Sequence, residues 1–205
     1  MPLFLICFIV FVICLRVKMR KSNSAISESS KAFWEREANA NFARSRDISE
    51  LDYIIVTEKD LPFSPEVSAL TDEREADLEQ QVLDASKRKM INLSAYTNTD
   101  LKEQYGIANL EELSNCDQNY LIFIRVLANW GSFLYEKKEY SRAKQIMEYS
   151  LSIGSDISSV YVTLGHIYAS EGNPSKIDEL IFSVEQSDFA LKNSILKQLT
   201  LCKLE

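Results

Sequence analysis

The chain begins with a long apolar run that is followed at once by basic residues. Residues 2–15 (PLFLICFIVFVICL) are apolar or proline, and no Asp or Glu precedes Glu28. A helix of fourteen to seventeen such residues would extend about 21–25 Å, which is short for a hydrocarbon layer of about 30 Å. We therefore expect a single transmembrane helix through residues 2–17, with basic side chains that reach up to the interface. The basic flank consists of Arg16, Lys18, Arg20 and Lys21.

The position of the basic flank predicts the topology of this anchor, which we assign to residues 1–21. Lys and Arg residues close to a span stay on the cytoplasmic side. Since all four lie after the span, we expect a single-pass protein of the cell membrane with its N-terminus outside and residues 22–205 in the cytoplasm. A cleaved signal peptide would carry its basic residues before the apolar run and a small-residue cleavage site behind it. That signal peptide and a buried helix of a soluble protein remain the alternatives.

A polar tether follows the anchor, and after it comes a predicted helix that carries several aromatic residues. Residues 22–30 are polar and rich in serine, which predicts a flexible tether. The next stretch, Ser30–Arg46, is rich in Ala, Glu and Arg and predicts a helix. Its apolar side chains are Phe33, Trp34, Ala38 and Phe42. Our preferred interpretation is that these aromatics pack on the domain, and the alternative is an amphipathic helix that lies on the membrane surface.

Residues 31–115 as a whole predict a helical region with one extended segment. That segment is Leu51–Pro62, where β-branched and aromatic residues gather. We expect it to pack against helices, and the alternative is a strand that pairs with a partner. One amphipathic helix is then predicted over Pro65–Lys89, and two short helices over residues 92–115, with caps in Thr97–Asp100 and a stop at Gly106. The acidic residues of the first of these helices, expected to face solvent, are Asp72, Glu73, Glu75, Asp77 and Glu79.

The most specific pattern lies after Asp117, where two segments superpose at a spacing of thirty-four residues. Gly131 matches Gly165, and both are small where we expect the two helices of a pair to cross closely. The other matched positions are Trp130 with Leu164, Leu134 with Tyr168, Tyr140 with Pro174, and Met147 with Ile181. Tyr140 and Pro174 are expected to begin the second helix of each pair.

This pattern resembles the tetratricopeptide repeat (TPR). Ile124–Ile157 resembles one repeat and Ser158–Phe189 a second, in which Ile177 stands where a small residue is expected. Asp188–Leu204 then predicts a capping helix. The resemblance implies a TPR-like domain over residues 117–205, and we expect the whole chain to be all-α. The stretches DISELDYIIVTEKDLPF and NTDLKEQYGIANL are also similar to uncharacterised membrane-anchored proteins of Gram-positive bacteria.

The resemblance implies that a protein or peptide partner binds in a concave groove lined by the first helix of each repeat. The groove positions would be Arg125, Ala128, Asn129, Ser132, Tyr135, Ser159, Val162, Thr163, His166 and Ala169. As partner-binding candidates we take Arg125, Asn129, Ser132, Tyr135, Thr163 and His166. Of the residues with which the family clamps chaperone tails, only Asn129 matches. Ser159 and Thr163 stand where basic residues are required, so we do not expect chaperone binding.

Composition excludes several classes of function. Without the basic flank the chain has 19 Lys and Arg against 30 Asp and Glu, a net charge of −11, and nucleic acid as a partner would require a basic face. Five Gly and four Pro are too few for the many tight turns of a β-sandwich or barrel. The single His and the four Cys lack metal-ligand spacing, so we expect no metal site and no cofactor.

These observations favour a protein that is not an enzyme. We expect a membrane-anchored protein–protein interaction adaptor with a cytosolic TPR-like domain. The alternative is a structural subunit of a larger membrane complex or of a homo-oligomer, and an enzyme of unknown chemistry comes third. No catalytic residue is predicted, because no nucleophile or base motif accompanies His166.

Overall fold

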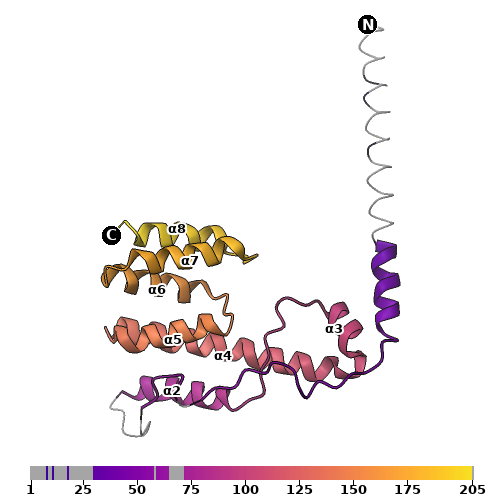
Figure 1. Ribbon diagram of the computed structural model, residues 1–205, viewed down its shortest axis with the longest axis horizontal. Helices are drawn as coiled ribbons and strands as arrows, with labels where there is room; N and C mark the ends of the chain where they lie inside the picture. Colours follow the sequence, from indigo (N-terminus) through magenta and orange to yellow (C-terminus); the bar gives the residue numbers. More distant parts are fainter. Residues whose placement is uncertain are drawn as a thin grey trace. The chain divides into compact units, whose positions relative to one another are not determined.

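The computed structural model describes residues 8, 11, 18, 30–57, 59–64 and 72–204 (Figure 1). These residues form helices joined by turns and irregular segments, and none of them lies in a β-strand, which confirms the all-α prediction. They divide into two compact units. The first unit draws its residues from Met1–Ser49 and Ser94–Glu111, and the second from Glu50–Leu93 and Glu112–Glu205.

The predicted anchor, residues 1–21, lies outside the described residues except for Phe8, Phe11 and Lys18. These three are helical and exposed. The predicted tether also lies outside them, up to residue 29. Within the described parts of the chain, no helix combines the length and the apolar character that crossing a membrane requires. The anchor therefore stays a prediction.

The first unit contains a helix at residues 30–40, helix α3 (Asn98–Tyr105) and a short 3-10 helix, η2 (Ile107–Asn109). The prediction of a helix as far as Arg46 is wrong, because the chain turns after residue 40. Two hydrogen bonds between residues three apart close that helix, from the N–H groups of residues 42 and 43. The unit is thus built from short helices rather than from one long one.

Both ends of α3 lie where the sequence predicts them. The Thr97 hydroxyl accepts a hydrogen bond from the Asp100 N–H, and the Asp100 carboxylate accepts one from the Thr97 N–H at 2.8 Å. Gly106 ends the helix with φ of 83°, a conformation that favours glycine. A Cβ at this position would also lie 2.7 Å from the Ser45 backbone. Glycine is therefore required here by both its conformation and the space available.

Residues 52–57 of the second unit are neither helix nor strand. The Ile54 N–H donates to the Met90 carbonyl at 2.9 Å, and the side chains of Ile54 and Val56 pack on the core. Ile55, which lies between them, is 80% exposed. The segment is therefore extended and half-buried against helices, and pairing with a partner strand stays an alternative.

Helix α2 extends from Glu73 to Ser86. The predicted single helix Pro65–Lys89 is wrong, because Asp72 has an extended backbone and caps α2 at its N-terminus. The Asp72 carboxylate accepts hydrogen bonds from two backbone N–H groups of the first turn, at 3.0 and 3.3 Å. Residues 65–71 lie outside the described residues, and residues 87–89 are not helical.

Helix α4 extends without a break from Leu110 to Glu136. The prediction of two short helices in residues 92–115 is therefore wrong, because the second is the first part of α4. The predicted domain boundary at residues 115–117 also lies inside this helix. One apolar stripe at a spacing of three to four residues continues through it, which explains why the polar residues near the boundary do not end the helix. Its buried members include Leu113, Cys116, Tyr120, Phe123, Leu127, Trp130 and Leu134.

Four shorter helices follow α4 in the second unit and are stacked one above another in Figure 1. They are α5 (Tyr140–Ser152), α6 (Ser158–Ser170), α7 (Pro174–Gln186) and α8 (Lys192–Cys202). Tyr140 and Pro174 begin α5 and α7, as the sequence predicts. Buried side chains of α2, α4 and α5 form most of one core cluster, and those of α5 to α8 form most of a second.

The turns α4–α5 and α6–α7 have the same backbone geometry at an offset of thirty-four residues. Three backbone hydrogen bonds recur at this offset, each from an N–H group to a carbonyl. The N–H of Lys137 donates to Phe133, as that of Glu171 does to Ile167. Likewise Lys138 donates to Tyr135 and Gly172 to Ala169, and Glu139 donates to Leu134 and Asn173 to Tyr168. In each turn one residue has a left-handed backbone, with φ of 65° at Lys138 and 66° at Gly172. The thirty-four-residue repeat in the sequence is therefore also a repeat in backbone conformation at these two turns.

The two matched glycines lie at different kinds of contact. A Cβ at Gly131 would lie 2.8 Å from Cε of Met147, so this glycine lets α4 approach α5, as predicted. A Cβ at Gly165 would lie 2.8 Å from Cδ2 of Leu199, and its three nearest atoms all belong to α8. The expectation that Gly165 marks the crossing with α7 is therefore wrong. The bulky Ile177 of α7 is buried where the pattern expects a small residue.

Candidate binding pocket between helices α2 and α4

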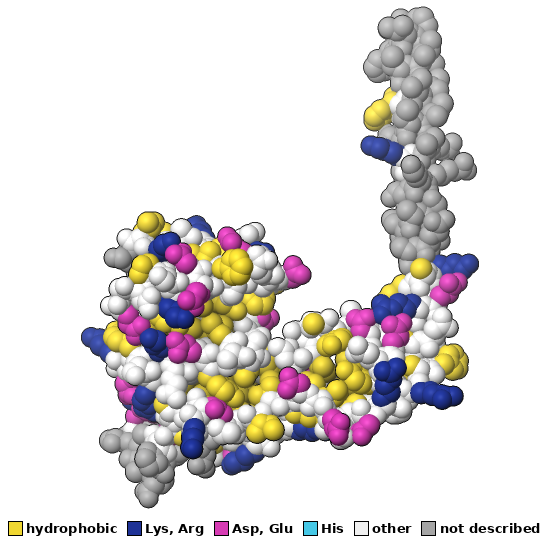
Figure 2. All heavy atoms as spheres, in the orientation of Figure 1, with side chains coloured by type: hydrophobic (Ala, Val, Ile, Leu, Met, Phe, Trp, Pro, Cys, Tyr) yellow, Lys and Arg dark blue, Asp and Glu magenta, His cyan; other side chains and the backbone are white. Residues whose placement is uncertain are grey.

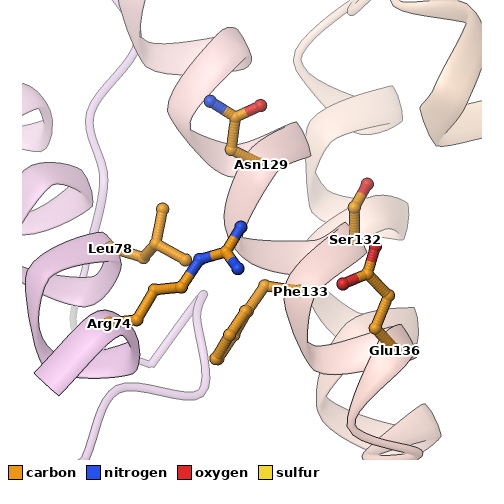
Figure 3. A pocket seen from close by; sticks show the side chains of 6 residues that line it. All are labelled: Arg74, Leu78, Asn129, Ser132, Phe133 and Glu136. Carbon is orange, nitrogen blue, oxygen red and sulfur yellow. The ribbon is translucent and has the colours of Figure 1, made fainter. Parts of the chain in front are cut away.

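Two of the predicted groove residues, Asn129 and Ser132, line a pocket of about 340 Å³ on the second unit (Figure 3). Both belong to α4, as do Phe133 and Glu136 at the same pocket, and α2 contributes the remaining wall. The α2 residues are Arg74 and Leu78. Residues that are fifty or more positions apart in the sequence therefore meet in one pocket.

The centre of the pocket is a cation beside an aromatic ring. The guanidinium of Arg74 lies 5.2 Å from the centroid of the Phe133 ring, and Nζ of Lys137 lies 4.9 Å from the same centroid. Arg74 forms no ion pair with any residue that the structure describes, and the same holds for Glu136 on the other wall. Among the described residues, the pocket thus presents a guanidinium and a carboxylate without ion-pair partners on either side of an aromatic ring.

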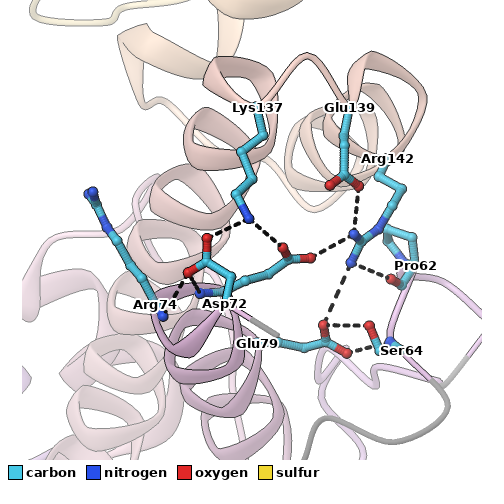
Figure 4. A network of polar contacts seen from close by, with 9 residues as sticks. Pro62, Ser64, Asp72, Arg74, Glu79, Lys137, Glu139 and Arg142 are labelled. Carbon is cyan, nitrogen blue, oxygen red and sulfur yellow. Dashed lines mark hydrogen bonds and ion pairs between the residues drawn. The ribbon is translucent and has the colours of Figure 1, made fainter. Parts of the chain in front are cut away.

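A network of charges with two buried carboxylates, Glu75 and Glu79, holds α2 against the turn between α4 and α5 (Figure 4). The guanidinium of Arg142 pairs with Glu75 at 2.7 Å and with Glu79 at 3.6 Å, and Nζ of Lys137 pairs with Asp72 at 2.5 Å and with Glu75 at 3.1 Å. Glu79 also accepts hydrogen bonds from the backbone and the hydroxyl of Ser64. Because Asp72 both caps α2 and pairs with Lys137 in the turn after α4, the network fixes the first turn of α2, which carries Arg74.

This network corrects one prediction from the sequence. The acidic face of α2 does not lie wholly in solvent, since Glu75 is 5% and Glu79 is 0% exposed. Burial raises the pKa of Glu75, but the hydrogen bonds from Arg142 and Lys137 outweigh burial and hold that pKa below its usual value. Buried carboxylates of this kind are tolerated because cations pair with them.

The other predicted groove residues do not join this pocket. Tyr135 is half-buried, and its ring centroid lies 5.4 Å from that of Tyr140. Nδ1 of His166 lies 3.5 Å from Sγ of Cys202, a thiol that is 1% exposed, so His166 faces α8. Arg125 is exposed and Thr163 half-buried.

The sequence analysis missed the α2 side of the pocket. Arg74 falls in the apolar spacing of that helix, between Leu70 and Leu78, so a cation on an otherwise apolar stripe was the available signal. Phe133 and Glu136 carried no such signal, because an aromatic and an acidic residue at helical spacing are ordinary in a helix. Which side of α4 faced α2 could not be read from the pattern.

Several side chains at the pocket can bind charged or polar groups. The guanidinium of Arg74 can pair with a carboxylate, Glu136 with a cation, and the amide and hydroxyl of Asn129 and Ser132 can hydrogen-bond to a peptide backbone. In the described part of the chain, no three His, Cys, Asp or Glu residues are grouped so that they could hold a metal ion. No protein-family model, curated protein or solved structure matches this chain.

Proposed function

We propose that this chain is a protein–protein interaction adaptor: a membrane anchor near its N-terminus holds a TPR-like domain, made of α4 to α8, in the cytoplasm. The partner is a protein or a peptide, and the pocket between α2 and α4 is one of its contact points. The repeated turn at an offset of thirty-four residues supports the TPR-like assignment. The adaptor carries no enzymatic activity, cofactor or nucleic acid in this proposal.

The observation that carries the binding proposal is the guanidinium of Arg74 on the Phe133 ring in the pocket, where no described residue forms an ion pair with it. Arginine and aromatic residues are enriched where proteins bind each other. Asn129 and Ser132, which the TPR resemblance places in the partner groove, line the same pocket. Two independent lines, the repeat pattern and the pocket, therefore meet at the same turns of α4.

Photocrosslinking tests this site directly. A photoreactive amino acid at Ser132 should crosslink the full chain to a partner in membranes, whereas the same amino acid at Gln118, exposed on the same helix, should not. Arg74→Gln should reduce the Ser132 crosslink several-fold. Arg88→Gln, a matched loss of charge at an exposed position after α2, should leave it unchanged. Equal crosslinking from both positions, or equal loss in both variants, would refute the pocket as the contact point.

A structural subunit of a membrane complex or a homo-oligomer is the second candidate. Figure 2 shows hydrophobic side chains among the charged ones on the stacked helices of the second unit. Several large apolar side chains near the end of this stack are more than half exposed, and an interface would cover them. They are Phe182, Leu191, Leu201 and Leu204. A concentration-dependent mass of the full chain in detergent, lost on Leu201→Ser and Leu204→Ser, would favour this candidate over the adaptor.

A further inference from the structure

The helix at residues 30–40 of the first unit leaves its aromatic side chains in solvent. Phe33 is 52% and Trp34 is 67% exposed, and their ring centroids lie 5.4 Å apart in an edge-to-face arrangement. Phe42, in the turn that ends the helix, is 87% exposed. The interpretation that these aromatics pack on the domain is therefore wrong for the described residues. Phe33 and Trp34 contact each other, and Phe42, later in the same segment, is exposed as well; we call these three residues the aromatic surface.

Other residues of the same helix attach it to α3. Arg36 donates hydrogen bonds to Asp100 at 2.6 Å and to Glu103 at 2.6 and 2.9 Å. Glu37 pairs with Lys102 and accepts a hydrogen bond from Thr99. Ala40 is 1% exposed. The fold of the first unit thus depends on polar and small residues of this helix. The aromatic residues contribute little to it, although each of them costs free energy when it is left in water.

The charges around the aromatic surface fit a lipid interface. Glu37, whose charge would oppose anionic lipid, is paired with Lys102, and the hydrogen bond from Lys102 holds the pKa of this still-charged carboxyl below its usual value. Arg44 follows Phe42 and forms no ion pair with a described residue. Glu35 lies 4.0 Å from Lys31, so it too has a cation beside it. A surface of aromatic residues with basic neighbours is typical of segments at the boundary between headgroups and acyl chains.

The chain length places this surface within reach of a bilayer. Residues 2–15 are apolar, and only eight residues, 22–29, separate the basic flank from Ser30. Eight extended residues span at most about 28 Å, and aromatic rings are favoured at the interface because one end of it is apolar and the other wet. We propose that Phe33, Trp34 and Phe42 insert into the interfacial layer of the bilayer that residues 2–15 anchor. This inference rests on the membrane anchor of the proposed function.

The two tryptophans of the chain make the test sharp. Trp130 is 0% exposed in the core of the second unit, so only Trp34 can meet lipid. The full chain is reconstituted into phosphatidylcholine vesicles with brominated acyl chains, which quench nearby tryptophans. Emission from Trp34 should fall at least twofold, and Trp34→Phe, which keeps an aromatic side chain, should remove the quenched part. Flotation of the same vesicles reports whether the chain is anchored.

The outcomes separate this inference from the proposed function. A chain that floats with its vesicles but shows no quenching would refute insertion of Trp34 and leave the anchor standing. Quenching that persists in Trp34→Phe would come from Trp130 and would also refute the inference. A chain that does not float would refute the anchor, and the inference with it. Adding anionic lipid to the vesicles should change the quenching less than Trp34→Phe does, because aromatic burial rather than charge provides the attraction.

Discussion

The turns at Lys138 and Gly172 allow a direct test of whether the thirty-four-residue spacing is structural. Lys138 has φ of 65° and Gly172 has φ of 66°. A left-handed backbone costs an ordinary residue roughly 1–2 kcal/mol. Lys138→Gly removes this strain but increases the entropy of the unfolded chain, which costs about 0.4–1 kcal/mol. We therefore expect Lys138→Gly to raise the free energy of unfolding by about 0.5–1 kcal/mol.

The reverse change at Gly172 is the matched control. A Cβ there would meet no atom within 4 Å, so the effect of Gly172→Ala is conformational and not steric. We expect Gly172→Ala to lower the free energy of unfolding by about 1 kcal/mol, a fall of about 2–4 °C in Tm. The double variant should lie close to wild type, because the two turns share no contact partner in these hydrogen bonds.

Urea titration of the full chain, followed by helical circular dichroism, measures all three variants under one condition. The sign of each change matters more than its size. If Lys138→Gly and Gly172→Ala destabilise the chain to the same extent, the two turns are not conformationally equivalent and the reasoning from the repeat is refuted.

Three further predictions concern the charge network, the helix crossings and the first unit. Arg142→Met leaves Glu75 buried with one cation fewer and should lower the free energy of unfolding by about 3–5 kcal/mol in urea; Arg142→Met with Glu75→Gln should recover part of this, and no recovery would contradict the pairing. Gly165→Ala should lower the free energy of unfolding by about 1–3 kcal/mol, because α8 crowds this position. Gly131→Ala should lower it less, since the end of the flexible Met147 side chain can move. Equal losses of stability in urea would show that α8 does not confine Gly165. Hydrogen bonds from Thr97 and Arg36 hold the pKa of Asp100 well below its usual value, so the stability it contributes is present above the usual pKa and is lost as the pH falls below it. The difference in Tm between wild type and Asp100→Asn should therefore shrink from about pH 5 to about pH 3, and a constant difference would contradict this.

Local sequence patterns were sufficient to predict that these segments are α-helical and where most of the helices after Glu136 begin and end. Apolar residues three to four apart, Pro174 at a helix start and Gly154 with φ of 86° after α5 act within a few residues of the chain. For the same reason the caps of α3 were predicted correctly. The failures at α2 and at the start of α4 are of another kind. Asp72 caps α2 inside the predicted helix, and a continuous apolar stripe carried α4 through a polar stretch that resembled a boundary.

The candidate site depended on contacts that no local pattern contains. Arg142 and Lys137 reach Glu75 from 67 and 62 positions away, and they turned a surface predicted to be solvated into a buried network. Arg74 lies in a pocket because this network and the burial of Val82 and Ala85 in the shared core position α2 beside α4. The predicted groove residues lie on α4 and α6, and their described contacts involve different neighbours, as His166 beside α8 shows.

Periodicity, caps and composition were enough to predict the helices of the described residues, the caps of α3 and the starts of α5 and α7, because these depend on interactions between residues a few positions apart. Folding alone decided which charges are buried, which helix Gly165 touches and which aromatics stay in solvent. Those outcomes depend on segments from distant parts of the chain approaching one another, since the free energy of burial and of ion pairing arises only where they meet.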